Sequence, residues 1–243
     1  CTRLAASTGH TYGHTVIGAE AFTAGEGGGN KWNTDPYALK ALGDAIYCGG
    51  VNHFVFHTYT HQPWSDRAPG MTMGACGTHF GRTNTWWEQS RDWMSYLSRC
   101  QWMLQQGLFV ADVCYFVGEN VPTSMYGGNL RVDGLPAGYD FDACSAEVLL
   151  NRMTVKDGRI VLPDGMSYAV LVLARQAAMR PETLRKIKEL VDGGATVVGS
   201  RPAKSPSLAD YPDCDREVKQ LADELWNPGR KGGKVVLDKP LPE

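Results

Sequence analysis

The run Leu108-Phe-Val-Ala-Asp-Val-Cys-Tyr-Phe-Val117 is almost continuously apolar and follows a glycine, Gly107. An apolar segment of this length, rich in valine and aromatic residues, is typical of a strand that is buried on both faces of a parallel sheet. Similar runs follow along the chain and alternate with amphipathic helical patterns. Strands are predicted near 108–117, 168–173, 195–199 and 234–237, and helices near 142–151, 181–192 and 214–226. This alternation predicts a doubly wound α/β domain with a parallel sheet.

Upstream of this domain, the sequence contains only two further strand patterns. They are Thr15-Val-Ile-Gly-Ala-Glu-Ala-Phe22 and Val51-Asn-His-Phe-Val-Phe-His-Thr-Tyr59, with helices predicted at 36–47 and 86–106. Two β/α units cannot close a parallel barrel, which needs eight units and typically ~250 residues. The two units could form an edge of the second sheet. A broken barrel is the preferred interpretation, because both strands end in reactive side chains, as barrel strands do where they meet their loops.

The sequence therefore predicts three parts. The first is the end of an incomplete (β/α)8 barrel at 1–107, and the second is an α/β domain at 108–232. Residues 233–243 are a last strand or a linker to a missing C-terminal domain. Inside the α/β domain, Lys156-Asp-Gly-Arg159 predicts a hairpin turn, because Asp-Gly favours the backbone of a tight β-turn.

Composition excludes several classes of function. The net charge of −2 and the charged fraction of 21% do not fit the basic face of a nucleic-acid binder. No apolar run reaches the ~18 residues of a membrane span. The chain begins without an initiator methionine, so we interpret it as part of a longer protein. We expect the full-length protein to be secreted or periplasmic, with an export signal that does not lie in this sequence. Its oligomeric state cannot be read from the sequence.

Glu20 is the leading candidate for a catalytic residue. It lies near the end of an apolar strand, and a buried carboxylate costs several kcal/mol unless it is paired or has a function. The structural alternative is an ion pair with an arginine or lysine on a neighbouring strand.

The second strand ends in a cluster of polar and aromatic side chains. His57, Tyr59, His61 and Trp64 lie within eight residues, which fits the hydroxyl groups and the apolar face of a sugar. A zinc site is the weaker alternative, since its His-x-x-x-His motif belongs on a helix with a glutamate beside the first histidine. We expect His53, deeper in the strand, to be a core histidine.

The glycine-rich stretch Gly25-Glu-Gly-Gly-Gly-Asn30 lacks the lysine of a nucleotide-binding loop. It would let a loop fold closely over a ligand, with Trp32 as a lid residue. In the second domain, the segment Val117-Gly-Glu-Asn120 lacks the compact phosphate loop of a flavin site. We therefore expect neither a nucleotide nor a flavin, and a structural role for Glu119.

Four sequence runs resemble those of glycoside hydrolase family 106, the α-L-rhamnosidases. They are Gly18-Ala-Glu-Ala-Phe22, the segment from Gly50 to Trp64, the segment from Thr78 to Ser90, and Val161-Leu-Pro-Asp-Gly-Met-Ser-Tyr168. The resemblance implies a (β/α)8 catalytic barrel followed by a flavodoxin-like domain. It also implies an inverting mechanism with two glutamates, assisted by a calcium ion that binds sugar hydroxyls, on a rhamnose-containing oligosaccharide or glycoside.

Within this resemblance, Glu20 matches the general base, and the general acid would lie upstream of the chain. His57, Tyr59, His61, Trp64 and Trp32 would contact the sugar, while no calcium ligand can be assigned. Two alternatives stay open: another barrel glycosidase such as a β-galactosidase, and a non-catalytic scaffold or binding module.

Overall fold

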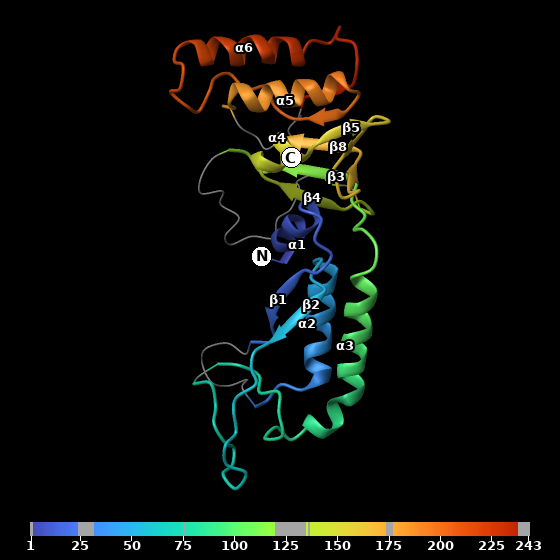
Figure 1. Ribbon diagram of the computed structural model, residues 1–243, viewed down its shortest axis with the longest axis vertical. Helices are drawn as coiled ribbons and strands as arrows, with labels where there is room; N and C mark the ends of the chain where they lie inside the picture. The colour runs from blue at the N-terminus through green and yellow to red at the C-terminus, as the bar shows by residue number, and fades with distance from the viewer. Residues whose placement is uncertain are drawn as a thin grey trace. The chain divides into compact units, whose positions relative to one another are not determined.

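The computed structural model describes residues 2–23, 32–74, 76–119, 135, 137–173 and 177–237. They fall into two compact units (Figure 1). The first unit comprises Thr2–Ala6 and Thr15–Gly107, and the second comprises Ser7–His14 together with the described residues from Leu108 onwards.

The first unit contains a two-stranded parallel sheet. Strand β1 (Gly18–Ala21) pairs with β2 (His53–Phe56), so that Gly18 lies opposite His53 and Glu20 lies opposite Val55. The prediction of two adjacent parallel strands, separate from the sheet of the second unit, is confirmed. The helices of this part of the chain are α1 (Thr2–Thr11), α2 (Pro36–Cys48), the 3-10 helix η1 (Trp87–Ser90) and α3 (Arg91–Leu104). Helix α1 was not predicted, and the helix predicted at 86–106 is divided into η1 and α3.

The two faces of this small sheet differ sharply. Strand side chains alternate between faces, and one face carries Ala21 and Phe54, which are buried against α2 and α3. The opposite face carries Gly18, Glu20, His53 and Val55, all of them exposed. The core of the unit gathers on the helical side, and its fully or nearly buried members include Ile17, Ala21, Phe22, Leu39, Val51, Phe54, Phe80, Trp93 and Leu97.

The second unit is built on a five-stranded parallel sheet in the order β4-β3-β8-β9-β10. A separate three-stranded antiparallel sheet, β5-β6-β7, lies in the same unit. The strands are β3 (Val113–Phe116), β4 (Phe141–Cys144), β5 (Thr154–Lys156), β6 (Arg159–Val161), β7 (Ser167–Tyr168), β8 (Val170–Leu173), β9 (Thr196–Val198) and β10 (Lys234–Val236). The helices are α4 (Ala146–Arg152), α5 (Pro181–Asp192) and α6 (Asp213–Leu225).

The predicted hairpin is confirmed as the turn between β5 and β6. Its two central residues, Asp157 and Gly158, have φ of 52° and 74°. Positive φ at both central residues is what a tight turn between twisted strands requires, and Asp-Gly satisfies it at low cost.

The prediction of a single helix over 142–151 was wrong at its start. Residues Phe141–Cys144 form the buried strand β4, and α4 begins only after Ser145, whose hydroxyl accepts a hydrogen bond from the Val148 amide at 3.3 Å. The misleading residue was Asp142, a charged side chain that is fully buried within this strand. It accepts hydrogen bonds from His10 Nδ1 at 2.8 Å and from the Tyr168 hydroxyl at 3.0 Å, which compensates for its burial.

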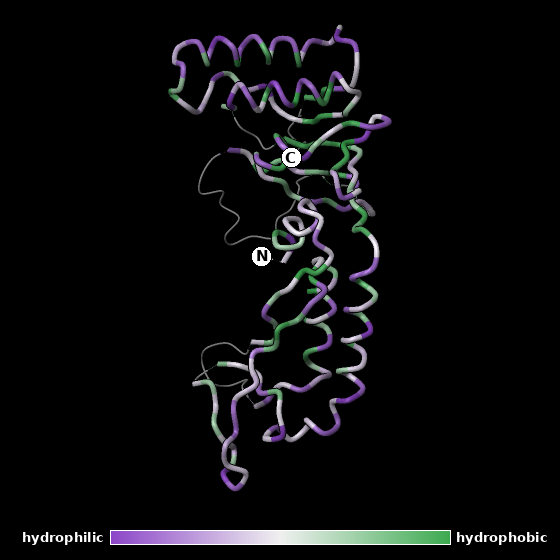
Figure 2. The backbone as a smooth tube through the Cα atoms, in the orientation of Figure 1, coloured by the Kyte–Doolittle hydropathy of each residue, from purple (hydrophilic) through white to green (hydrophobic). Residues whose placement is uncertain are grey.

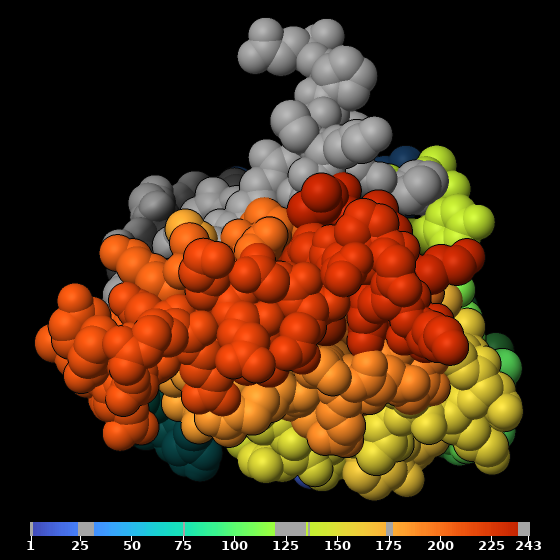
Figure 3. Space-filling model, turned by 90° about the horizontal axis from the view of Figure 1, so that it is seen from above, coloured from blue at the N-terminus to red at the C-terminus, as the bar shows by residue number. Residues whose placement is uncertain are grey.

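Helices α5 and α6 pack against each other and cover one side of the second unit (Figures 1 and 3). The hydropathy colouring in Figure 2 shows apolar strands beneath helices whose outer turns are hydrophilic. The buried Glu119 carboxylate accepts hydrogen bonds from the Arg180 amide at 2.8 Å and from the Thr183 hydroxyl at 2.5 Å. Glu119 therefore stabilises the N-terminus of α5, in agreement with the structural role predicted for it. Among the described helices, none has the length and apolar character of a membrane-crossing segment.

Candidate active site

Glu20 lies at the carboxyl end of β1, on the face of the sheet that no helix covers. The prediction that it is buried was wrong, because the side chains that pack in this unit lie on the other face of the strand. Its carboxylate accepts a hydrogen bond from the Thr23 hydroxyl at 2.7 Å. Within the described part of the chain, no lysine or arginine forms an ion pair with Glu20, so the structural alternative finds no support there.

The chain turns sharply directly after this strand. Phe22 has a φ of 64°, in the left-handed region that bulky residues rarely adopt. Its ring is held in the core by an edge-on contact with Phe54 at 5.2 Å and by a tilted contact with Trp93 at 5.5 Å between ring centroids. This aromatic packing fixes the turn, and the turn fixes where the strand ends beyond Glu20.

His53 lies on the same exposed face as Glu20, and the expectation of a core histidine was wrong. Its register partner is Gly18, which has no side chain to cover the imidazole. A Cβ at Gly18 would lie 3.7 Å from His53 Cδ2, so the ring lies over the glycine. The sequence carries this signal in the alternation of the strand, since His53 and Val55 share one face while Phe54 points to the other.

His57 follows the end of β2, and its amide donates to the Ala21 carbonyl at 3.2 Å. The side chain is partly buried and packs on Gly77, which has a φ of +98°. A Cβ at that glycine would lie 2.9 Å from His57 Nδ1, so only a glycine fits against the ring here. Nδ1 is shielded from solvent and has no hydrogen-bond partner in the described residues.

The long loop after β2 returns to the end of that strand. The Thr58 amide donates to the Thr78 carbonyl at 2.6 Å, and the Phe80 amide donates to the Thr58 carbonyl at 2.9 Å. Within the loop, Gln62 clamps Met71, with Nε2 donating to its carbonyl at 2.7 Å and Oε1 accepting from its amide at 2.9 Å. These bonds tie the described loop residues to the end of β2 and to one another.

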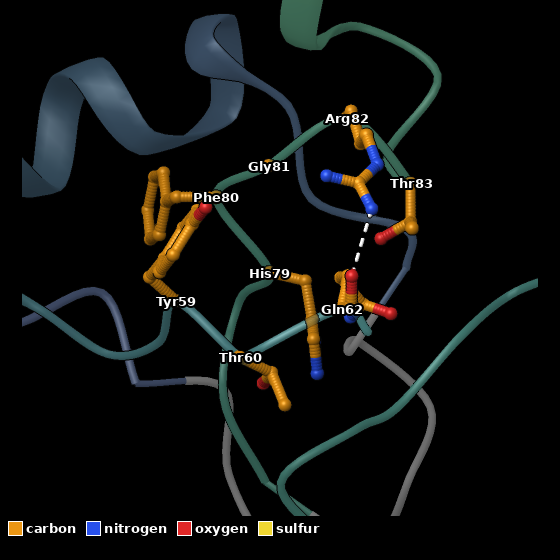
Figure 4. Close-up of a pocket in the computed structure, with 8 residues that line it drawn as sticks. All are labelled: Tyr59, Thr60, Gln62, His79, Phe80, Gly81, Arg82 and Thr83. Atoms are coloured by element: carbon orange, nitrogen blue, oxygen red, sulfur yellow. Dashed lines mark hydrogen bonds between the residues drawn. The ribbon is translucent and has the colours of Figure 1, made fainter. Parts of the chain in front are cut away.

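The returning loop encloses a small hollow of about 20 Å3 against the residues that follow β2 (Figure 4). Tyr59 is the one predicted site residue that lines it. The other lining residues were not predicted as site residues: Thr60, Gln62, His79, Phe80, Gly81, Arg82 and Thr83. In Figure 4 the Arg82 guanidinium reaches toward Gln62, and its Nη2 donates to the Gln62 carbonyl at 2.9 Å. A segment twenty residues further along the sequence completes the hollow, and no local pattern predicts such a return.

Trp32 stacks on His79, with ring centroids 4.4 Å apart and 22° between the planes. His79 is buried and also lines the hollow, so it connects two predicted residues, Trp32 and Tyr59. The glycine-rich residues 25–30, expected to fold over a ligand, lie outside the described residues.

His61 and Trp64 lie away from this hollow. Both are exposed, and the indole of Trp64 lies under the Arg67 guanidinium, 5.6 Å from its ring centroid. The guanidinium lies over one of the two faces of this exposed indole. The structure thus brings Tyr59 and Trp32 together through His79, and it leaves His57, His61 and Trp64 at separate positions of the same loop region.

A calcium ion was expected from the family resemblance. Among the described residues, no three histidine, cysteine, aspartate or glutamate side chains gather closely enough to hold a metal ion. Calcium takes six to eight oxygen ligands, which include main-chain and amide carbonyls as well as carboxylates, so calcium stays an expectation from the family resemblance. No chemical step is therefore derived through calcium.

Comparison with known proteins gives consistent matches over this chain. The sequence profile of glycoside hydrolase family 106, alpha-L-rhamnosidase, matches residues 2–241. A protein of Formosa agariphila named "Putative beta-glucuronidase" is 45% identical over 227 residues, which cover 93% of this chain and 19% of that protein. The structure of a rhamnosidase from Novosphingobium sp. PP1Y matches with a TM-score of 0.87 and 34% identity, covering 96% of this chain and 22% of that one.

The chain thus spans about a fifth of the length of these relatives. The match to the family profile covers nearly the whole sequence and includes Glu20 together with the loop that follows β2. This chain belongs to glycoside hydrolase family 106, the family of the α-L-rhamnosidases.

Proposed function

We propose that the full-length protein removes α-L-rhamnose from a glycan with inversion at the anomeric carbon, and that Glu20 is its general base. The general acid is a second carboxyl group, supplied by a part of the protein outside this chain. The proposal rests on the family and on one observation: a carboxylate without an ion-pair partner among the described residues, at the carboxyl end of a parallel strand and on the face that no described helix covers.

The position of Glu20 supports this role on geometric grounds. In a (β/α)8 barrel the helices surround the strands, so strand residues that point away from the helices point into the barrel. Phe54 and Ala21 point toward α2 and α3, and Glu20 points the other way. Catalytic groups of such barrels lie at the carboxyl ends of the strands, which is where Glu20 lies on β1.

The mechanism follows from the two carboxyl groups. The Glu20 carboxylate accepts a proton from a water molecule as that water attacks the anomeric carbon. The acid on the opposite side of the ring donates its proton to the leaving glycosidic oxygen. The two carboxyl groups must leave room for the water, which places them ~6.5–9.5 Å apart in inverting enzymes. The Thr23 hydroxyl, bound to Glu20 Oε1, orients the base.

The proposed architecture is the end of a catalytic barrel at 1–107, followed by a flavodoxin-like domain at 108–232. Numbered in chain order, the strands of the second parallel sheet follow the spatial order 2-1-3-4-5. This order is that of flavodoxin-type doubly wound sheets, which supports the proposal. In the proposed enzyme the first unit carries the chemistry, and His57, Tyr59, His61, Trp64 and Trp32 contact the substrate from the loop region.

A second candidate activity, that of a β-glucuronidase, comes from the name of the Formosa relative, "Putative beta-glucuronidase". A glucuronidase would use the same strand-end carboxylate on another sugar. The deciding experiment offers the full-length protein aryl α-L-rhamnoside, aryl β-glucuronide and aryl β-galactoside. Release of rhamnose alone, as the β-anomer by proton NMR immediately after cleavage, supports the proposal. Exclusive release of glucuronate selects the second candidate, and hydrolysis of none of a broad set of glycosides favours a binding module.

A further inference from the structure

Arg82 carries a positive charge that the described residues do not neutralise. The side chain is exposed, and no carboxylate of the described residues lies within ion-pair distance of it. Its one hydrogen bond there is to a main-chain oxygen, from Nη2 to the Gln62 carbonyl at 2.9 Å. The guanidinium is therefore held by a main-chain oxygen, and its other N–H donors have no acceptor among the described residues.

The hollow beside Arg82 is lined by neutral polar groups. The Tyr59 ring, the Thr60 hydroxyl and the Thr83 hydroxyl come from two segments that meet there (Figure 4). Thr60 Oγ1 is shielded from solvent and has no hydrogen-bond partner in the described part of the chain. A buried hydroxyl without a partner indicates a missing polar group, and a volume of about 20 Å3 accommodates one of water size.

The amide of Gln62 is not available for a ligand. Both of its polar atoms bind Met71, at 2.7 and 2.9 Å. Among the described residues, the site thus offers one arginine, hydroxyl groups and the His79 imidazole, and no carboxylate lines it. An arginine held in this way is suited to a planar or tetrahedral oxyanion, which it binds through two parallel N–H···O bonds.

We propose that the mouth of this hollow is a subsite for an anionic sugar residue of the substrate, where the exposed Arg82 binds its carboxylate or sulfate oxygens and the hollow itself accommodates only a group of water size. The inference rests on the proposed function and deepens it: the glycan that is cleaved carries a uronic acid or a sulfated sugar next to the rhamnose. Rhamnose itself is neutral, so the charge belongs to its neighbour in the glycan.

The test measures binding separately from catalysis. The full-length Glu20→Gln protein is titrated by calorimetry with rhamnosyl-glucuronic acid, with the same disaccharide reduced at the carboxyl to rhamnosyl-glucose, and with a sulfated rhamnosyl-glucose. We expect at least one acidic ligand to bind about tenfold or more tightly than the neutral one. The preference should shrink with added salt, because the guanidinium is exposed. The ligand that binds more tightly shows whether the site recognises a carboxylate or a sulfate.

Substitution of Arg82 then assigns the preference. In the same background, Arg82→Gln should bring the ratio of acidic to neutral affinity to about one, and Arg82→Lys should retain part of it. Arg67→Gln is the matched control, since Arg67 is also an exposed arginine of this loop but lies over Trp64. It should leave the ratio unchanged. Thermal unfolding of each variant establishes that it is folded.

Two results would overturn the inference: a ratio near one in the starting protein, or a preference that survives Arg82→Gln. The first would also be obtained if an acidic side chain from another part of the enzyme occupies the subsite and pairs with Arg82. Activity measurements distinguish a failure of the subsite proposal from a failure of the proposed function. An enzyme that cleaves aryl rhamnosides but shows no acidic preference contradicts only the subsite, and one that binds acidic sugars through Arg82 without cleaving rhamnosides contradicts only the proposed function.

Discussion

The Thr23 hydroxyl donates a hydrogen bond of 2.7 Å to Oε1 of Glu20, and the left-handed turn at Phe22 separates the two residues. This bond restricts the rotation of the proposed base. We expect Thr23→Val in the full-length enzyme to lower kcat about threefold to tenfold, as for loss of an exposed hydrogen bond to a charged group. Thr23→Ser keeps the hydroxyl and should stay near the wild-type rate. Equal rates for the valine and serine variants would show that the bond does not position the base.

Glu20→Gln keeps the shape of the side chain and removes its basicity. General bases contribute typically ~10²–10⁴-fold, so kcat on an aryl rhamnoside should fall by that amount while KM changes little. Glu119→Gln is a matched control, because Glu119 is also a strand-end glutamate but binds Arg180 and Thr183. It should lower the thermal stability and leave the pH profile of kcat unchanged. If Glu20→Gln and Glu119→Gln lowered kcat by similar factors, the result would contradict the assignment of Glu20 as the base.

The 243-residue chain by itself should hydrolyse no rhamnoside. It contributes β1 and β2 and one candidate glutamate, while the chemistry needs two carboxyl groups. The measurement is release of rhamnose by purified chain above a blank that contains the Glu20→Gln chain. Release above this blank would mean that both carboxyl groups are present in these residues.

Gly77→Ala should disturb the loop return at the end of β2. The added Cβ would lie 2.9 Å from His57 Nδ1 and from Thr58 Cγ2, at a φ of +98°. Gly74→Ala is the control, since Gly74 also has positive φ, 55°, but no atom lies within 4 Å of the added methyl. Both variants carry a backbone penalty, and it is larger at a φ of 98° than at 55°, so the larger fall in Tm and the rise in KM expected for Gly77→Ala report the clash together with this strain. Similar values for the two variants would argue against close packing of His57 on the glycine.

Tyr168 makes the second unit sensitive to alkali. Two effects raise the pKa of Tyr168 well above its usual range: burial, which is the larger, and the nearby charge of Asp142. A tyrosine whose pKa is raised on folding contributes stability that is complete below pH ~10 and is lost as the pH rises above it, because only the unfolded chain ionises. The loss is about 1.4 kcal/mol per pH unit. Denaturant unfolding of the chain between pH 9 and 11 should show this slope.

The matching variants separate Tyr168 from other alkaline effects. Tyr168→Phe should cost about 1 kcal/mol at neutral pH, through loss of the hydrogen bond to Asp142, and should flatten the slope above pH 10. Tyr139→Phe, at an exposed tyrosine, should change neither. An unchanged slope in Tyr168→Phe would assign the alkaline sensitivity to another group.

Much of the fold could be predicted from local patterns. The apolar run around Val113 and the Asp-Gly turn at 157–158 each carry their own signal, and both elements formed as predicted. Strand β4 did not, because Asp142 interrupts its apolar pattern and the residues that satisfy the carboxylate, His10 and Tyr168, are distant in sequence. Tertiary contacts of this kind override local propensity.

Some residues of the candidate site could be predicted from the sequence, and others could not. Glu20 and Tyr59 could be selected because each belongs to or directly follows a strand. His79 and Arg82 could not, since they join the hollow only through the loop return at Thr58 and Thr78. The burial of Glu20 was predicted wrongly because an apolar strand does not reveal which of its faces receives a covering layer.

Gln62 uses its two ends for different tasks: its side chain clamps Met71, and its main-chain carbonyl holds Arg82. Any residue at position 62 supplies the carbonyl, whereas only a glutamine-like side chain supplies the clamp. Insertions, deletions or substitutions in residues 63–71 should therefore leave Arg82 in place. Related enzymes could therefore differ in residues 63–71 and still keep the proposed contact between Arg82 and the glycan.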